Sequence, residues 1–344
     1  MIKPSNQSPA LCSVKQRGTL TAGSNDFFIG LAPMAGLTGW PMRVLCYRMG
    51  ASYACTEMVS AIGLITAKPG NPTYSYLLAT HCEESNTACQ VFGHDPIVLG
   101  EAVAQITELG RFTSIDLNMG CPARKITRSG EGSALLQTPE LAYKLMLSAV
   151  RNTHLPVTVK TRIRYNTQHE VMLDIAEAAE NLGLMWVCIH GRTQEQQYSG
   201  LADYSAIATI CSHVSIPIIA NGDVSTPESA ISILKETGAS GMVIGRGAIG
   251  NPWLLRNVRN ALMGSPPSNP SLSERIETAI LHAEMTIAYK GEYKAIHEMR
   301  KHVTHYLDGI HGAVHIRRVL NQVQNLIELK EALYKWLMQK EGVI

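Results

Sequence analysis

The chain has 344 residues, of which 45% are hydrophobic, 17% charged and 6% aromatic. That hydrophobic fraction supports a packed core and excludes disordered, collagen-like and coiled-coil chains; the length suits two domains or one large α/β barrel with an appendage. The 30 Lys and Arg against 28 Asp and Glu leave a formal charge of +2. This balance argues against a broadly basic nucleic-acid binder but leaves room for a local basic face.

The cysteines and the N-terminal segment bear on the cellular compartment. None of the 8 cysteines is spaced as C-x-x-C, so neither a zinc ribbon nor a thioredoxin motif is predicted, and we expect no metal. Residues 1–26 are polar and lack an apolar signal segment, and no apolar run reaches membrane-spanning length. We therefore expect a cytoplasmic protein with no membrane association.

Short apolar runs recur through the first three quarters of the chain. Eight of them are predicted strands: 27–34, 52–58, 88–93, 114–120, 157–163, 185–191, 216–222 and 241–247. Helical patterns lie between most of them, for example Glu170–Leu182 and Pro227–Leu234. Eight strand–helix units in about 230 residues predict a (β/α)8 barrel. A doubly wound sheet is the alternative, disfavoured because no G-x-G-x-x-G follows the first strand.

Composition also predicts the boundaries of the parts. We expect a polar extension at 1–26, a barrel at 27–263, a Pro/Ser/Gly linker at 264–273 and a small all-helical unit at 274–344. The helical unit carries six of the 12 histidines and several Arg and Lys residues. We expect the chain to act as a monomer.

Polar residues stand where seven of the predicted strands end. They are Glu57, Gln90, Asn118 with Cys121, Lys160 with Arg162, His190 with Arg192, Asn221 with Asp223, and Arg246. A single polar strand end usually makes a structural hydrogen bond. Seven of them converge on the mouth of a barrel, which is where barrel active sites form.

Glycine turns follow the last two strands, at Asn221-Gly222-Asp223 and Gly245-Arg246-Gly247. Barrels commonly bind phosphate at these two loops, through backbone N–H groups. Glycine lets the backbone approach an anion, and Arg246 could add charge-assisted hydrogen bonds. Ordinary strand-to-helix turns are the alternative, but the pair favours a phosphate-bearing ligand.

Lys160 has three interpretations: a Schiff-base lysine, a cation beside an electron-rich cofactor, or a buried ion pair with Glu57. Gln90 can donate and accept hydrogen bonds, which suits the edge of a pyrimidine ring. His190 could donate to the same ring, although a structural core histidine is equally compatible with the sequence. Beside a phosphate site, the Lys, Gln and His together suit flavin mononucleotide (FMN) better than a sugar substrate.

Cys121 follows the fourth strand in NMGCPARK, on a loop stiffened by Pro122. A thiol at the barrel mouth, flanked by cations, could act as an acid, whereas the other cysteines suit buried, inert positions. Neighbouring strand ends add cations to a predicted basic rim that could bind a polyphosphate backbone. The residues expected in this rim are Arg43, Arg124, Lys125, Arg128, Arg162, Arg164 and Arg192.

The order and spacing of several motifs carry a family resemblance. LAPMAGLT, QVFG, DLNMGCPARK, VKTR, HGRT, ANGD and IGRG, with GSALL downstream, resemble the bacterial tRNA-dihydrouridine synthases, closest to their B-type subgroup. The resemblance implies an FMN-containing barrel with a C-terminal helical tRNA-binding domain. It also implies reduction of the uracil C5–C6 double bond in tRNA, with NADPH or NADH as reductant.

The resemblance assigns roles to individual residues. Cys121 matches the general acid that protonates C5 while hydride from the flavin goes to C6. The positions matching the flavin site are Pro33, Met34, Ala35, Gln90, Lys160, His190, Asn221, Gly222, Asp223, Gly245 and Arg246. Asn118 matches a position near the flavin and the flipped base, and we place Arg124, Lys125, Arg162 and Arg192 on the substrate side.

One departure from the B-type pattern follows the lysine strand. The usual Ile-Arg-x-Gly-Trp is replaced here by residues 161–165, TRIRY, which puts the substrate-side details in question. Two other functions are compatible with parts of the sequence: an FMN barrel that reduces a small molecule, and a non-enzymatic RNA-binding protein. The helical appendage disfavours the first, and the presence of Cys121 with every flavin-side residue disfavours the second.

Overall fold

The computed structural model describes residues 27–166 and 172–342. The predicted extension at 1–26 and the predicted helix start at Glu170 lie outside these residues. The strands are β1 (Phe28–Leu31), β2 (Tyr53–Cys55), β3 (Val59–Ser60), β4 (Thr87–Phe92), β5 (Ser114–Met119), β6 (Val157–Arg162), β7 (Trp186–His190), β8 (Ile218–Asn221) and β9 (Gly241–Ile244).

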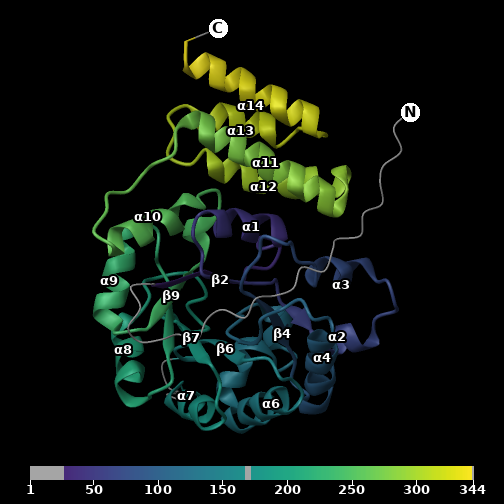
Figure 1. Cartoon of the computed structure of the whole chain (residues 1–344), viewed down its shortest axis with the longest axis vertical. Coiled ribbons are helices and arrows are strands. Elements are labelled where there is room, and N and C mark those ends of the chain that lie inside the picture. Colours follow the sequence, from purple (N-terminus) through teal and green to yellow (C-terminus); the bar gives the residue numbers. More distant parts are fainter. Residues whose placement is uncertain (1–26, 167–171, 343–344) are drawn as a thin grey trace.

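The strands form a closed parallel barrel, which confirms the predicted fold (Figure 1). β1 pairs with both β2 and β9, and β2 pairs with β4, so eight strands complete the ring. β3 is an additional two-residue strand on β4. The barrel pairing of the run 52–58 extends to the Thr56 N–H, which donates to the Ala88 carbonyl at 3.0 Å, and Glu57 beyond it accepts a hydrogen bond from the Gly36 N–H at 2.5 Å.

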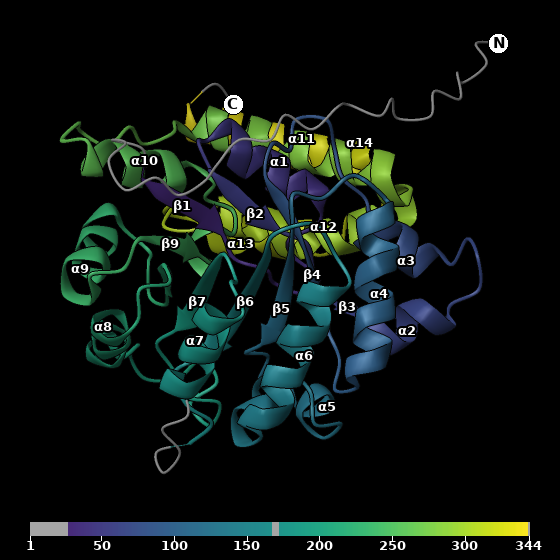
Figure 2. The same cartoon turned by 60° about the horizontal axis from the view of Figure 1, so that its bottom comes forward.

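Helices surround the barrel between successive strands (Figure 2). Several start where the chemistry of helix caps predicts; α9 begins with a Thr226–Ser229 capping box and ends at Gly238, in the left-handed region with φ 66°. The helices are α1 (Trp40–Arg48), α2 (Ala61–Thr66), α3 (Pro72–Leu77), α4 (Pro96–Glu108), α5 (Arg124–Thr127), α6 (Pro139–Arg151), α7 (Met172–Asn181), α8 (Tyr204–His213), α9 (Pro227–Thr237) and α10 (Trp253–Leu262), with 3-10 turns η1 (Gly132–Gln137) and η2 (Arg246–Ala248).

The remaining helices lie together beside α1 and α10, outside the ring around the barrel (Figure 1). They are α11 (Leu272–Lys290), α12 (Glu292–Tyr306), α13 (Ala313–Leu320) and α14 (Leu326–Lys340). α11 starts two residues before the predicted boundary at 274, because Ser271 and Glu274 form a capping box there. No helix within 27–166 and 172–342 is long and apolar enough to cross a membrane.

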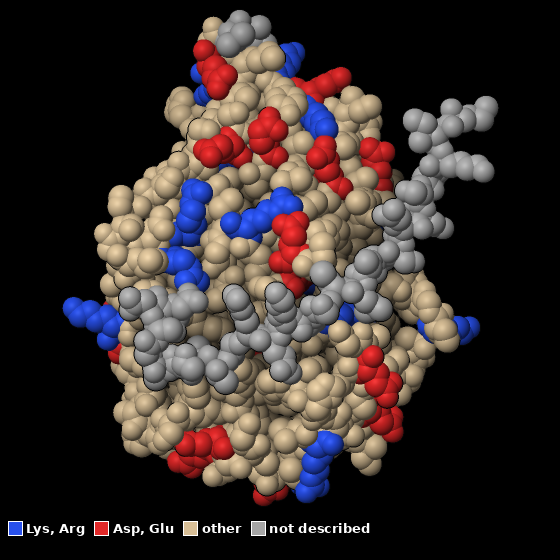
Figure 3. Space-filling view, viewed as in Figure 1, with Lys and Arg blue, Asp and Glu red and all other residues tan. Residues whose placement is uncertain are grey.

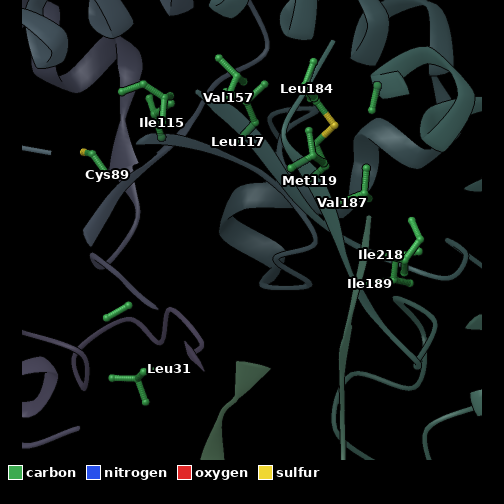
Figure 4. Packing of buried hydrophobic residues seen from close by; sticks show 14 of the residues in the cluster. Leu31, Cys89, Ile115, Leu117, Met119, Val157, Leu184, Val187, Ile189 and Ile218 are labelled. Carbon is green, nitrogen blue, oxygen red and sulfur yellow. The ribbon is translucent and has the colours of Figure 1, made fainter. Parts of the chain in front are cut away.

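Three buried clusters organise the packing. The largest packs outward-facing strand residues against the helices; Figure 4 shows Leu117, Ile189 and Ile218 among them. A second cluster fills the interior of the barrel, where the rings of Phe28, Tyr53 and Trp186 contact one another near the starts of their strands. The third joins α11–α14 to Trp253 of α10. These aromatic rings fill the barrel interior near the N-terminal ends of the strands. The polar strand residues therefore lie toward the C-terminal ends.

Candidate active site

Five predicted site residues lie on five neighbouring strands at one end of the barrel. Gln90, Asn118, Lys160, His190 and Asn221 come from β4 to β8 in that order. Register places Asn118 beside Lys160, and His190 beside Asn221. The C-terminal halves of these strands therefore bring together the polar groups that the sequence predicted to converge.

A chain of amide hydrogen bonds links three of the site residues. Asn118 Nδ2 donates to Gln90 Oε1 at 2.8 Å, and Asn118 Oδ1 accepts from the Cys121 N–H at 3.0 Å. Asn118 is half-buried and can reach a bound group, whereas Gln90 is only 1% exposed. Gln90 therefore contacts Asn118 directly and is itself almost fully buried.

Lys160 is held by a neutral partner. Its Nζ donates to Asn221 Oδ1 at 2.9 Å, and Asn221 Nδ2 donates in turn to the Val243 carbonyl at 2.8 Å. The alternative of an ion pair with Glu57 is wrong, because that carboxylate bonds the Gly36 N–H instead. A half-buried ammonium with a neutral partner keeps its charge available for an electron-rich ligand.

His190 is buried among cations, which fixes its protonation state. Burial, together with the charges of Lys160, Arg162, Arg192 and Arg246, lowers the pKa of His190 to about 2, so the ring is neutral. Arg192 Nη1 lies 3.4 Å from His190 Nε2. Because a guanidinium can only donate, Nε2 accepts and the proton lies on Nδ1. His190 is therefore a neutral hydrogen-bond donor.

The two glycine turns pack directly on each other. A Cβ at Gly247 would lie 2.3 Å from the Val224 carbonyl oxygen, so only glycine allows this approach. Gly222 and Asp223 both have positive φ, at 130° and 54°, which curls the first turn. Arg246 is 55% exposed beside these turns, with Nη2 3.9 Å from Asp223 Oδ1. A curled backbone with an accessible guanidinium is the arrangement that binds a phosphate.

The loop after β1 faces the second turn. A Cβ at Gly245 would lie 3.8 Å from Met34 Sδ, which places the predicted flavin-lining loop beside the predicted phosphate turn. Pro33 and Met34 are half-buried, and Ala35 is exposed. The Met34 N–H donates to Thr38 Oγ1 at 3.0 Å. A flat ligand that carries a phosphate could lie with its flat part against this loop and its phosphate against the two glycine turns.

Two of the predicted rim arginines are buried and fasten a loop. The Arg162 guanidinium donates to the carbonyls of Gly120, Thr193 and Gln197 at 2.8–2.9 Å. Arg192 donates to the Ser199 and Gly200 carbonyls, and to both Asp223 oxygens at 2.7 and 2.9 Å. Each of the two arginines is 2% exposed. They thus secure segment 193–200 to the mouth instead of presenting free charge.

Arg43 was predicted in the basic rim, and this prediction is wrong. The side chain is 1% exposed, and its Nε lies 2.6 Å from Glu84 Oε2. Its Nη atoms donate to the Thr38 and Ala79 carbonyls. A fully paired guanidinium stabilises the fold locally but cannot bind a polyphosphate. Arg124, Lys125 and Arg128 are exposed on and just after α5, as a rim requires.

Cys121 lies on a tightly held loop at the mouth. Its carbonyl accepts from the Ser133 N–H at 3.1 Å and from Ser133 Oγ at 2.9 Å. Gly132 has φ 60°, and a Cβ there would lie 2.8 Å from the same carbonyl. Partial burial raises the pKa of the thiol above its usual value, although the Ala123 backbone, Arg162 and Lys160 oppose the shift. The thiol is therefore protonated at neutral pH and can give up a proton.

Three residues near the site are not among those predicted from the sequence. Ser133 and Gly132, which anchor the Cys121 carbonyl, belong to the GSALL segment that was used only as a motif. Asp116 lies in the middle of β5 and is 2% exposed. The sequence does carry a signal for it: a carboxylate between Ile115 and Leu117 in the middle of a buried strand.

Together these features define a (β/α)8-barrel protein with a thiol, an ammonium and a pair of packed glycine turns at one end of the barrel. Comparison with known proteins identifies the family. The family model "Dihydrouridine synthase (Dus)" matches residues 30–340, and the chain belongs to the dihydrouridine synthase family, a family of oxidoreductases.

Individual relatives extend along most of the chain. It is 36% identical over 304 residues to tRNA-dihydrouridine synthase B of Salmonella typhimurium, covering 88% of this chain and 93% of that protein. It is 37% identical over 319 residues to tRNA-dihydrouridine synthase B of Pasteurella multocida, covering 91% and 95%. A probable tRNA-dihydrouridine synthase of Mycobacterium tuberculosis is 37% identical over 312 residues, covering 87% and 79%.

Proposed function

We propose that this protein reduces the C5–C6 double bond of uridine in tRNA, with bound FMN as the redox group and NADPH or NADH as the reductant. The observation that carries the proposal is a half-buried, protonated Cys121 on a fixed loop next to Lys160 and Asn118. Family membership and the names of the relatives support this reaction and substrate.

The residues present fit FMN. Gly222, Asp223, Gly245 and Arg246 would hold its phosphate, with the Asp223 carboxylate kept away from the anion by its pairing with Arg192. Lys160 and His190 would donate to the ring edge, and Pro33, Met34 and Ala35 would lie against its face. When bound, the flavin supplies the hydride that goes to C6 of uracil.

Cys121 would supply the proton. As hydride arrives at C6, the thiol proton moves to C5, and one two-electron reduction consumes one hydride and one proton. The remaining thiolate is then reprotonated from solvent. Asn118, whose Nδ2 faces Met58 Sδ at 3.8 Å as well as Gln90, would orient the base by donating to it in place of the weak sulfur acceptor. A uridine reaches this site only after leaving its stack, because the reacting atoms must lie flat on the cofactor.

The RNA backbone would be held by cations on two elements: exposed Arg124, Lys125 and Lys301, with Arg300 and Arg317 half-buried beside Lys301. Arg124 and Lys125 stand on α5 beside Cys121. On the helical unit, a groove of about 490 Å³ between α12 and α13 is lined by His297, Arg300, Lys301, Thr304, His305, Asp308, Arg317 and Asn321. Figure 3 shows several Lys and Arg side chains where the barrel meets the helical unit, with Asp and Glu side chains beside them and on the helical unit. Contacts to a polyphosphate backbone would therefore be made by individual cations. We propose residues 274–344 as the RNA-binding domain.

The decisive experiment compares wild-type protein with Cys121→Ala. Wild-type protein should be yellow, oxidise NADPH and form dihydrouridine in unmodified tRNA, measured by mass spectrometry. Cys121→Ala should retain flavin and NADPH oxidation but lose about 100-fold or more in uridine reduction, the usual contribution of a positioned acid. Cys211→Ala, which changes a thiol on α8, is the matched control.

The outcomes separate the alternatives. A colourless protein that takes up no FMN would refute the flavin assignment. A flavoprotein that leaves every tRNA uridine unchanged would indicate a small-molecule reductase. Full tRNA turnover by Cys121→Ala would remove Cys121 from the acid role.

A further inference from the structure

Asp116 is a buried carboxylate in the interior of the barrel whose role the proposed reaction leaves open. It lies on β5, and both of its oxygens are engaged. Oδ1 accepts from Thr158 Oγ1 at 2.6 Å, and Oδ2 accepts from Gln90 Nε2 at 2.7 Å. Cys55 Sγ lies 3.8 Å from Oδ2. Burying a carboxylate this deeply removes its hydration, which destabilises the fold unless hydrogen bonds to the carboxylate offset the loss.

A continuous series of hydrogen bonds runs from Asp116 to the loop of Cys121. Gln90 Nε2 donates to Asp116, and Gln90 Oε1 accepts from Asn118 Nδ2 at 2.8 Å. Asn118 Oδ1 then accepts the N–H of Gly120 at 3.2 Å and of Cys121 at 3.0 Å. Two side-chain amides thus connect the carboxylate to the backbone that carries the thiol.

The groups at both ends of this series determine which amide atoms donate and which accept. At one end, backbone N–H groups can only donate, so Asn118 must present Oδ1 to them. At the other end, Asp116 Oδ2 must accept, so Gln90 must present its NH2 group there and Oε1 to Asn118. If Oδ2 carried a proton, Gln90 would turn over and its NH2 would meet the NH2 of Asn118. The arrangement therefore depends on an acceptor at Asp116 Oδ2.

We propose that Asp116 is a positioning residue that sets the orientation of the Gln90 and Asn118 amides and fastens the Cys121 loop through them. Its effect on catalysis rests on the proposed uridine reduction, but its effect on the loop does not.

The orientation has a consequence for specificity. Asn118 Oδ1 uses both lone pairs on Gly120 and Cys121, so it has none left for a ligand. One Nδ2 hydrogen is given to Gln90, and the other faces Met58 Sδ at 3.8 Å, a weak acceptor that a ligand carbonyl oxygen can replace. Asn118 can then donate to a carbonyl oxygen but cannot accept from an amino group. Uracil offers a carbonyl at C4 where cytosine carries an amino group, so a fixed donor favours uracil at that edge.

Two substitutions of Asp116 distinguish a role in orienting the Gln90 and Asn118 amides from a role in packing. Asp116→Asn keeps an acceptor for Gln90 by turning its NH2 toward Thr158 Oγ1, whose hydroxyl can then donate to the Ile115 carbonyl, 3.4 Å away. Asp116→Val suits a buried strand but removes the acceptor. A purely structural role for the charge would impair both variants, whereas an orientation role is rescued by Asn.

The first measurement is amide hydrogen exchange at Gly120 and Cys121, which requires no assumption about function. Loss of Asn118 as a fixed acceptor should raise exchange about tenfold in Asp116→Val, the effect of one lost hydrogen bond, with Asp116→Asn close to wild type. Equal protection in wild type and Asp116→Val would overturn the proposal. If Asp116→Val fails to fold, Gln90→Met breaks the series one bond further along and should give the same result.

The second measurement is single-turnover oxidation of the reduced enzyme by unmodified tRNA. We expect Asp116→Val to be slowed at least tenfold while reduction by NADPH changes less than threefold, and Asp116→Asn to recover most of the rate. Equal slowing of both variants would overturn the orientation role. A wild-type enzyme inactive on tRNA would defeat the proposed function, while the exchange data would still decide the role of Asp116.

Discussion

Arg192 offers a sharp test of how the mouth of the barrel is built. Its guanidinium is buried and donates to the Ser199 and Gly200 carbonyls and to both oxygens of Asp223. It therefore connects the loop at 193–200 to the first of the two glycine turns. Arg192→Met keeps the aliphatic stem but removes every one of these donors.

The expected cost follows from the groups left behind. Removing one partner of a buried charge pair costs about 3–5 kcal/mol, and the 25% exposure of the Asp223 side chain favours the lower end, about 3 kcal/mol. With an unfolding entropy of about 2.1 cal/mol/K per residue, that loss lowers Tm by about 4 °C. The Asp223 carboxylate is also freed to face the phosphate turn, so FMN affinity should fall at least tenfold through repulsion between like charges.

Thermal unfolding of the FMN-free protein and fluorescence titration with FMN measure the two effects separately. Arg124→Met is the matched control, because it removes an exposed guanidinium on α5 and should change stability by no more than about 0.5 kcal/mol. Arg192→Met with the stability and FMN affinity of wild type would refute the claim that this arginine secures the turn. A loss of equal size in both variants would indicate a general charge effect.

Three further predictions concern the phosphate turns, a buried histidine and the ammonium. Gly247→Ala should cost about 1–3 kcal/mol and reduce FMN retention because its Cβ meets the Val224 carbonyl, whereas Gly39→Ala, with its nearest atom 3.6 Å away, should be neutral by thermal unfolding. Burial lowers the pKa of His302 to about 4, so only the unfolded state binds this proton between pH 6.5 and 4, and stability falls there on acidification. His302→Gln should reduce that slope by about 1.4 kcal/mol per pH unit in urea unfolding, and an unchanged slope would contradict the assignment. Lys160→Met should weaken FMN binding or slow the reduction of FMN about 10-fold or more, because a hydrogen bond from a charged group is lost. Stopped-flow kinetics identical to wild type would show that Lys160 does not act at the flavin site.

The pattern of apolar and polar residues is enough to predict the class of fold and the positions of the polar strand ends. Continuous apolar runs alternating with amphipathic helices can be buried on both faces only in a parallel sheet, and eight repeats are enough to close it. Because side chains alternate along a strand, residues such as Asn118 and Lys160 were bound to reach the same interior once the barrel closed.

The fate of each charge was decided only by tertiary structure. Arg43 and Arg124 look alike in the sequence, yet Arg43 is sealed against Glu84 while Arg124 is exposed. Burial depends on partners that lie far along the chain: Arg162 is held by carbonyls up to 42 residues away, and Asp116 bonds Thr158 on the neighbouring strand, also 42 residues away. Local sequence fixes where a side chain points along its own element. Closure of the barrel decides which groups surround that side chain. Those groups in turn decide whether the side chain binds a ligand or holds a loop.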